Sequence, residues 1–139
     1  MNRLDRRRFL QITAGALALP ACASLVFTPV TPEAGRLELS LDRYPRLTEP
    51  DGYLKLRLPD ERALYVVHLG RGQYAVLSPT CTHLGCTVDV GSSGLLCPCH
   101  GSLYDREGGV VRGPAMRPLT RYPATVTSDG RLVVNLEGV

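Results

Sequence analysis

"CTHLGC" (Cys81–Cys86) and "CPCHGS" (Cys97–Ser102) together hold four of the chain's five cysteines and two of its three histidines. Thiolates and imidazoles are the side chains that bind zinc and iron in proteins. Gly85 and Gly101 can adopt a positive φ at low cost, so each stretch can curl its backbone around a bound group. Two ligands from each stretch make four, the number that a tetrahedral site needs. The sequence therefore predicts a metal centre built from two loops.

The first 31 residues have the layout of an export signal. The arginines Arg6–Arg8 are followed by an uncharged, mostly apolar run, Phe9–Leu19, and then by small residues. The arginines and the residues after them resemble a twin-arginine motif, which directs export of folded proteins and suits a cofactor inserted in the cytosol. We expect residues 1–31 to be a signal or membrane anchor and residues 32–139 to be the domain, on the periplasmic face of the cell membrane.

Two outcomes are open for this segment. It is cleaved if "LPAC", ending at Cys22, acts as the lipobox that it resembles, or if "ACA", ending at Ala23, is recognised by ordinary signal peptidase. It is retained if the uncharged stretch Phe9–Pro32 spans the bilayer, for which it is long enough. A membrane tether is the expectation that we carry forward. Thr28–Gly35 is predicted to be a short, proline-stiffened linker.

The cysteine count leaves two thiols that a zinc site would not use. A Cys₂His₂ zinc site would take Cys81, His83, His100 and one of Cys97 and Cys99, which leaves Cys86 and the remaining cysteine. An exported protein meets an oxidising compartment, where such thiols pair. A disulfide between the two loops would clamp the site from outside and would contribute about 3 kcal/mol in the chain-entropy model.

The rest of the chain predicts short strands and no helix. Leucine occupies every second position in Arg36–Leu41 and Tyr53–Leu58, which is the period of a strand with one buried face. Arg62–Leu69 and Tyr74–Ser78 flank a glycine-rich turn, and Tyr122–Leu136 surrounds a Ser-Asp-Gly turn, so both pairs predict hairpins. The 14 glycines and 11 prolines fit a fold rich in turns. The expected fold class is an all-β antiparallel sandwich.

The charge of the domain excludes nucleic acid as a partner. The net charge of +3 is already reached within the first eight residues, and the remainder carries 12 basic and 12 acidic residues. Nucleic-acid binding needs a basic face on the folded body, which this balance does not predict. His68 lies in a strand pattern far from both loops, so we expect a structural role for it rather than a ligand role.

The two cysteine- and histidine-containing stretches give the chain a resemblance to the Rieske iron–sulfur proteins. "CTHLGC" and "CPCHGS" match the two Rieske boxes, C-T-H-x-G-C and C-x-C-H-G-S, at every fixed position. The resemblance implies a Rieske-type sandwich with a cluster-binding subdomain of two loops, at about residues 78–116, that holds one [2Fe–2S] cluster. It implies that Cys81 and Cys97 bind one iron, that His83 and His100 bind the other, and that Cys86 and Cys99 form the disulfide.

The resemblance also implies a high-potential type of Rieske protein. A disulfide of this kind is typical of quinol-oxidising complexes and of arsenite oxidase small subunits. Ser102 is implied to donate a hydrogen bond to a bridging sulfide, and Tyr104 to a cysteine ligand; both raise the potential because they spread negative charge. Leu84 would cover the cluster, and "GPA" at Gly113–Ala115 resembles the proline loop that shields it.

The implied function is one-electron transfer from quinol to a c-type cytochrome. The chain would be one subunit of a membrane quinol-oxidising complex, beside a cytochrome b-type subunit, and would not be catalytic alone. His100 would accept a hydrogen bond and a proton from quinol. The alternative is the small subunit of a periplasmic molybdenum oxidase resembling arsenite oxidase, which passes electrons without quinol. A structural zinc module is a third possibility.

Overall fold

The computed structural model describes residues 26–138. This part of the chain is built from strands, with two short 3₁₀ turns, η2 (Leu41–Arg43) and η3 (Pro45–Leu47), and no α-helix. None of the helical turns in this range has the length or apolar character needed to cross a membrane. The twin-arginine-like arginines and Cys22 lie outside the described residues, so their expected roles stay predictions.

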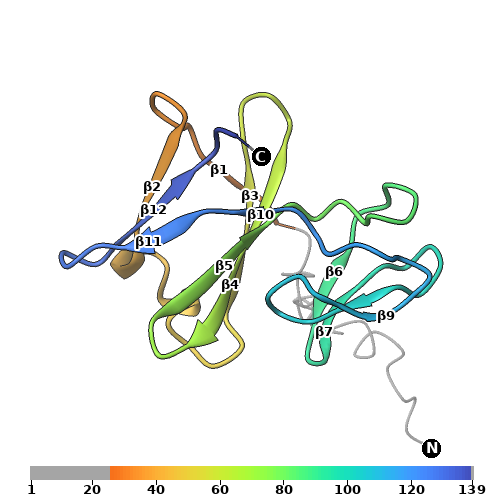
Figure 1. The fold of residues 1–139 in the computed structure, drawn as a ribbon. Coiled ribbons are helices and arrows are strands. Elements are labelled where there is room, and N and C mark those ends of the chain that lie inside the picture. Colours follow the sequence, from red (N-terminus) through yellow and green to blue (C-terminus); the bar gives the residue numbers. More distant parts are fainter. Residues whose placement is uncertain (1–25, 139) are drawn as a thin grey trace, which may run out of the picture.

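The strands form three sheets, and the expected all-β sandwich is confirmed (Figure 1). The central sheet has five strands in the order β1–β3–β4–β5–β10. A three-stranded sheet, β11–β12–β2, packs on one of its faces, and a four-stranded sheet, β6–β7–β8–β9, lies on the other. The bounds of the strands are β1 Thr28–Pro29, β2 Arg36–Ser40, β3 Tyr53–Arg57, β4 Ala63–Gly70, β5 Gln73–Leu77, β6 Asp89–Gly91, β7 Gly94–Leu96, β8 Leu103–Tyr104, β9 Val110–Arg112, β10 Arg121–Tyr122, β11 Ala124–Val126 and β12 Arg131–Asn135.

Both predicted hairpins are present. β4 pairs antiparallel with β5, and β11 pairs antiparallel with β12 around the Ser-Asp-Gly turn. β2 pairs with β12 over its whole length, from Arg36 opposite Asn135 to Ser40 opposite Arg131. Pro123 separates β10, in the central sheet, from β11, in the three-stranded sheet, so the chain changes sheets at this proline.

The central sheet is buried on both faces, which explains the dense apolar sequence of its strands. Along β4, Leu64 and Val66 belong to a core shared with the three-stranded sheet, whereas Tyr65 and Val67 belong to a second core shared with the four-stranded sheet. The first core is made by the alternating leucines of β2 and β3 and by β12. The second core contains Cys81 and Cys97. We call residues 78–120, with their four-stranded sheet, the loop subdomain, and the two other sheets the base sandwich.

Lys55 and Tyr65 join the base sandwich to the loop subdomain. Alternation along β3 would leave Lys55 in solvent, opposite its leucines, but its side chain is only 5% exposed because the loop subdomain covers this face. Its Nζ lies 3.5 Å from an Asp89 carboxylate oxygen and 5.1 Å from the centre of the Tyr65 ring. The Tyr65 hydroxyl donates a hydrogen bond of 3.0 Å to the carbonyl of Val88.

The predicted linker is attached to the domain rather than free. β1 pairs with β3 in parallel, with Thr28 opposite Leu56, so this one pair departs from the expected antiparallel pattern. Phe27, just before β1, packs on Tyr65 with ring centres 6.3 Å apart. The Arg57 guanidinium carbon lies 4.3 Å from the centre of the Phe27 ring. The chain therefore follows the sheet from residue 27 onward.

Candidate metal centre

The two loops have the same backbone framework, although one carries its histidine two residues after its first cysteine and the other three. In each loop the glycine four residues after the first cysteine donates its N–H to that cysteine's carbonyl, at 2.9 Å from Gly85 and 3.0 Å from Gly101. Both glycines have positive φ, +81° and +78°, as the turns require. The first cysteine donates in turn to the carbonyl five residues on, at 2.7 Å in the first loop and 2.8 Å in the second. Two equivalent turns therefore face one another.

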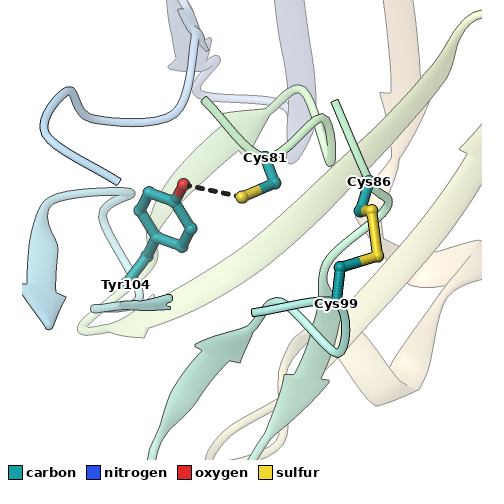
Figure 2. Close-up of a disulfide and its surroundings, with 4 residues drawn as sticks. All are labelled: Cys81, Cys86, Cys99 and Tyr104. Atoms are coloured by element: carbon teal, nitrogen blue, oxygen red, sulfur yellow. Dashed lines mark hydrogen bonds between the residues drawn. A yellow bond between two sulfur atoms is a disulfide. The ribbon is translucent and has the colours of Figure 1, made fainter. Parts of the chain in front are cut away.

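A disulfide joins the two loops. Cys86 of the first loop is bonded to Cys99 of the second, across a sequence separation of 13 residues, as the resemblance implied (Figure 2). The sulfurs of Cys86, Cys97 and Cys99 lie within 4.8 Å of one another. Since two of them are spent on the disulfide, only Cys97 in this group remains available as a ligand.

The remaining thiols and the two histidines fit a bound metal group. Cys81 and Cys97 are free thiols, and each is 2% exposed. The rings of His83 and His100 are 4.9 Å apart and perpendicular, so one histidine from each loop reaches the same place. Nδ1 of His83 is buried and has no hydrogen-bond partner among residues 26–138. A buried ring nitrogen without a partner is costly, and a metal bond would satisfy it.

Tyr104 holds the sulfur of Cys81 from strand β8. Its hydroxyl lies 3.2 Å from the Cys81 Sγ (Figure 2). The same hydroxyl accepts the Thr82 N–H at 3.1 Å. Burial raises the pKa of the Tyr104 hydroxyl, and the bond to the Cys81 sulfur raises it further. Burial also opposes ionisation of Cys81, but hydrogen bonds, chiefly from Tyr104, hold the pKa of that thiol below its ordinary value. The site therefore favours a thiolate at Cys81.

Ser102, in the second loop, is fully buried and has a hydroxyl proton available to donate. Its Oγ accepts the backbone N–H of Ala115 at 2.9 Å, which uses an oxygen lone pair and leaves the hydroxyl proton to be donated. This hydroxyl is also among the groups that hold the pKa of Cys81 below its ordinary value. The Tyr104 hydroxyl therefore lies beside a cysteine sulfur, where the resemblance places it, whereas the implied bond from Ser102 to a bridging sulfide stays a prediction.

A third loop, residues 113–117, covers the site, and a hydrogen bond from Thr82 holds it to the first loop. The segment that follows the cis peptide between Gly113 and Pro114 contacts both motif loops. Ala115 bonds to Ser102 of the second loop, and the Arg117 carbonyl accepts the Thr82 hydroxyl of the first at 2.6 Å. No functional role was predicted for Thr82. Its position between two expected ligands was the available signal, since a side chain there contacts whatever covers the site.

The outer surface of the site is apolar and accessible. Leu84 in the first loop is 70% exposed and Met116 in the third loop is 94% exposed, while His100 lies exposed in the second. His68 takes no part. Its Nδ1 lies 2.8 Å from the Glu49 carbonyl and its ring stacks on Tyr74, which is the structural role expected for it.

The comparisons with known proteins agree with this site. The profile of the Rieske [2Fe-2S] domain matches residues 47–123. The chain is 35% identical to the cytochrome b6-f complex iron-sulfur subunit of Synechococcus elongatus, over 94% of this chain and 83% of that protein. It superposes on the crystal structure of the plasma-membrane Rieske protein of Synechocystis PCC 6803 with a TM-score of 0.54 at 37% identity, covering 60% of this chain and 86% of that one.

A third similarity is to a chain of a hyperthermophilic respiratory complex III, with 26% identity and a TM-score of 0.52, covering 68% of this chain and 71% of that chain. Together these matches explain the free thiols, the paired histidines and the hydrogen bond to sulfur by one cofactor, a [2Fe–2S] cluster. The chain belongs to the Rieske [2Fe–2S] family.

Proposed function

We propose that the chain is the Rieske subunit of a membrane quinol-oxidising complex, and that it passes single electrons from quinol to a c-type cytochrome. The observation that carries the proposal is the 35% identity to a cytochrome b6-f iron-sulfur subunit along 94% of the chain. A cytochrome b-type subunit is the expected neighbour, and the chain alone is not a complete enzyme. The expected alternative, the small subunit of a molybdenum oxidase, is not favoured, because relatives that are similar along nearly the whole chain are cytochrome b6-f iron-sulfur subunits.

Four side chains are proposed as the iron ligands. Cys81 and Cys97 would hold one iron and His83 and His100 the other, as the resemblance implies. The free, buried thiols and the unpartnered His83 nitrogen support this set. The disulfide removes Cys86 and Cys99 from it. The bound cluster supplies reversible one-electron chemistry at a potential that its histidine ligands raise above that of an all-cysteine cluster.

The chain's own residues set the potential within that range. The Tyr104 hydroxyl lies beside the Cys81 sulfur, and the Ser102 hydroxyl also favours the ionised form of Cys81. A hydrogen bond donated to sulfur stabilises added negative charge. Both hydroxyls are buried, so water does not compete for the sulfur. These contacts support a potential in the upper half of the Rieske range, nearer about +300 mV than −150 mV.

His100 is the proposed contact for quinol. Its ring is exposed, whereas His83 is half-buried, so a quinol hydroxyl reaches the outer ring nitrogen of His100 more readily. That nitrogen would accept the hydrogen bond and the proton. Leu84, at 70% exposure, offers an apolar surface beside the histidine against which the quinone ring packs and from which water is excluded.

Two measurements test the proposal. The purified, reduced protein should give a rhombic EPR signal with an average g value well below 2; a colourless, zinc-containing protein would refute it. In membranes, Leu84→Ala should slow quinol-dependent reduction of the c-type cytochrome while the EPR signal is retained. Val126→Ala, which shortens another exposed side chain on β11 of the base sandwich, is the control and should leave the rate unchanged.

The location of the domain is part of the proposal. We propose that residues 1–31 export the domain by a twin-arginine-like route and that residues 32–139 lie on the periplasmic face of the membrane. A fusion of residues 1–35 to a folded reporter should be exported, and Arg6→Lys with Arg7→Lys should abolish export. Export of the double variant at the normal rate would refute the assigned route.

A further inference from the structure

The surface over the proposed ligands combines an exposed apolar centre with unpaired positive charge. We propose that it is a docking surface for a redox partner protein. The partner presents carboxylates around the place on its own surface where it receives the electron. The proposal rests on the proposed electron-transfer function and adds the chemistry of the partner. In the transfer, the reduced cluster loses one electron and the partner's metal centre gains it.

Met116 is at the centre of this surface. Its neighbour Ala115 is bonded to the second loop and its neighbour Arg117 to the first, so Met116 is held between the two loops that carry the proposed ligands. Its side chain is 94% exposed and Leu84 is 70% exposed. Large apolar side chains exposed this fully are typical of binding surfaces, because burying them on association is favourable.

Arg112 supplies one of the charges. Its guanidinium donates from Nε and Nη2 to the carbonyl of Gly101, at 3.3 and 3.2 Å, and Gly101 directly follows His100. The guanidinium therefore lies beside the second loop, although its residue belongs to β9. A carbonyl group leaves the positive charge of Arg112 uncompensated. Among residues 26–138, no carboxylate lies within 4 Å of it.

Arg117 supplies the second charge. Its backbone carbonyl is fixed to Thr82 of the first loop, while the residue itself is exposed. In the described part of the chain its side chain has no carboxylate partner either. Two arginines without a carboxylate partner in the described part of the chain therefore lie beside the apolar centre, one reaching the second loop from β9 and the other in the third loop.

The acidic residues of the loop subdomain are turned away from this surface. The subdomain has three: Asp89, Asp105 and Glu107. Asp89 lies beside Lys55 of the base sandwich, and Glu107 lies 3.7 Å from Arg121 of β10. Asp105 accepts the N–H groups of its own turn. Neither the two motif loops nor the third loop contains an acidic residue. The charges are thus segregated within a domain whose basic and acidic residues balance.

This separation of charges favours a partner with a negatively charged surface. A local positive potential attracts an acidic protein surface and speeds its encounter, whereas it repels a basic one. The docked partner would bury Leu84 and Met116 at the centre, with its carboxylates around them facing Arg112 and Arg117. A second copy of this chain would bring like charges together, so it does not fit.

The test measures how the charge of a small probe affects its approach to the surface. The full, cluster-loaded chain is reduced and then oxidised in a stopped-flow instrument by ferricyanide, a trianion, or by tris(phenanthroline)cobalt(III), a trication. Each accepts the single electron that the cluster gives. With Arg112→Gln and Arg117→Gln together, we expect the ferricyanide rate at about 10 mM ionic strength to fall about tenfold and the cobalt rate to rise, because two charges within a Debye length of the probe are removed. Glutamine keeps an N–H donor for Gly101.

Arg36→Gln is the matched control, to be made singly and with Arg71→Gln. Both residues are exposed arginines of the base sandwich, so the double control changes the net charge of the chain as the test variant does. The control should alter either rate less than about twofold. Equal changes in the control and the test variant would overturn the proposal, since net charge would then explain them.

A binding measurement makes the result independent of electron transfer. The chain has two methionines, Met1 and Met116, so ¹³C-methyl labelling gives two signals, assigned with Met116→Leu. The redox-inert paramagnetic trianion hexacyanochromate(III) should broaden the Met116 signal, and the double variant should lose this broadening. Persistent broadening in the double variant would overturn the proposal, as would salt-sensitive dimerisation or binding to phosphatidylglycerol vesicles through the same two arginines. Absence of the EPR signal would instead refute the proposed function, because the methyl measurement needs no cluster.

Discussion

The two faces of the central sheet bury similar numbers of apolar side chains. They differ in the interactions that hold the layer packed on each face. On the side of the three-stranded sheet, the core is made of leucine, valine and tyrosine from alternating strands. On the side of the loop subdomain, the core includes two free thiols, and the loops above it are fixed by a disulfide and by single hydrogen bonds. The first side depends on a repeated pattern and the second on individual atoms, so substitutions should affect the two sides differently.

The largest expected effect is loss of the cofactor from the loop subdomain. Cys97→Ala removes a proposed ligand from a site where the sulfur is 2% exposed and where neighbouring cysteines are already paired. We expect no EPR signal and no bound iron, while the far-ultraviolet circular dichroism of the base sandwich is retained. A variant that keeps a full complement of iron would refute the proposed ligand set.

The next effect concerns the opposite face. Leu56→Ala empties a fully buried site in the core beneath the three-stranded sheet, and it should lower the free energy of unfolding by about 2–5 kcal/mol. The EPR line shape of the folded fraction should not change, because no proposed ligand contacts this core. Urea unfolding followed by circular dichroism measures the loss. A changed line shape would show that the two faces are not independent.

The disulfide should matter for the loops more than for the base. Replacing Cys86 and Cys99 together by alanine removes a cross-link worth about 3 kcal/mol in the chain-entropy model. We expect the visible absorbance of the cluster to bleach at a lower temperature than the base sandwich melts. If bleaching and melting instead shifted together by the same amount, the loops and the base would form a single cooperative unit.

The smallest effect should be confined to the redox potential. Tyr104→Phe removes one hydroxyl from the Cys81 sulfur and should lower the potential by about 40–60 mV, since a tenfold change in a one-electron equilibrium is 59 mV. Voltammetry measures the shift. Tyr65→Phe is the control: it removes another buried hydroxyl, bonded to the Val88 carbonyl, and should cost about 1 kcal/mol of stability without moving the potential.

The base sandwich was largely predictable because its signals are local. Alternating leucines in β2 and β3 and the two turn-flanked hairpins give strands whose burial follows directly from a period of two. The four short strands of the loop subdomain were not predicted, since segments of two or three residues have no measurable period. They pair with one another, and Leu95 and Tyr104 join them to a core shared with the central sheet.

The site was predicted from its motifs, but its supports were not. The two boxes predicted the cysteines, the histidines and Ser102, because their spacing is specific, and the family resemblance added Tyr104, two residues beyond the second box. The roles of Thr82 and Lys55 could not be predicted from the sequence. Thr82 bonds to a carbonyl 35 residues away, and Lys55 is buried by a subdomain that β3 does not pair with. Contacts between residues so far apart in the sequence cannot be predicted from the local pattern of apolar and polar residues.

The grouping of the Cys86, Cys97 and Cys99 sulfurs, where the two loops meet, has a consequence for the choice of ligand. These sulfurs lie within 4.8 Å of one another, and the disulfide leaves Cys97 as the one free thiol among them. Reduction of the disulfide would expose two further thiols beside the proposed ligand. We therefore expect the disulfide to protect the ligand set as well as to cross-link the loops, because it removes two sulfurs that would otherwise compete with Cys97 for iron.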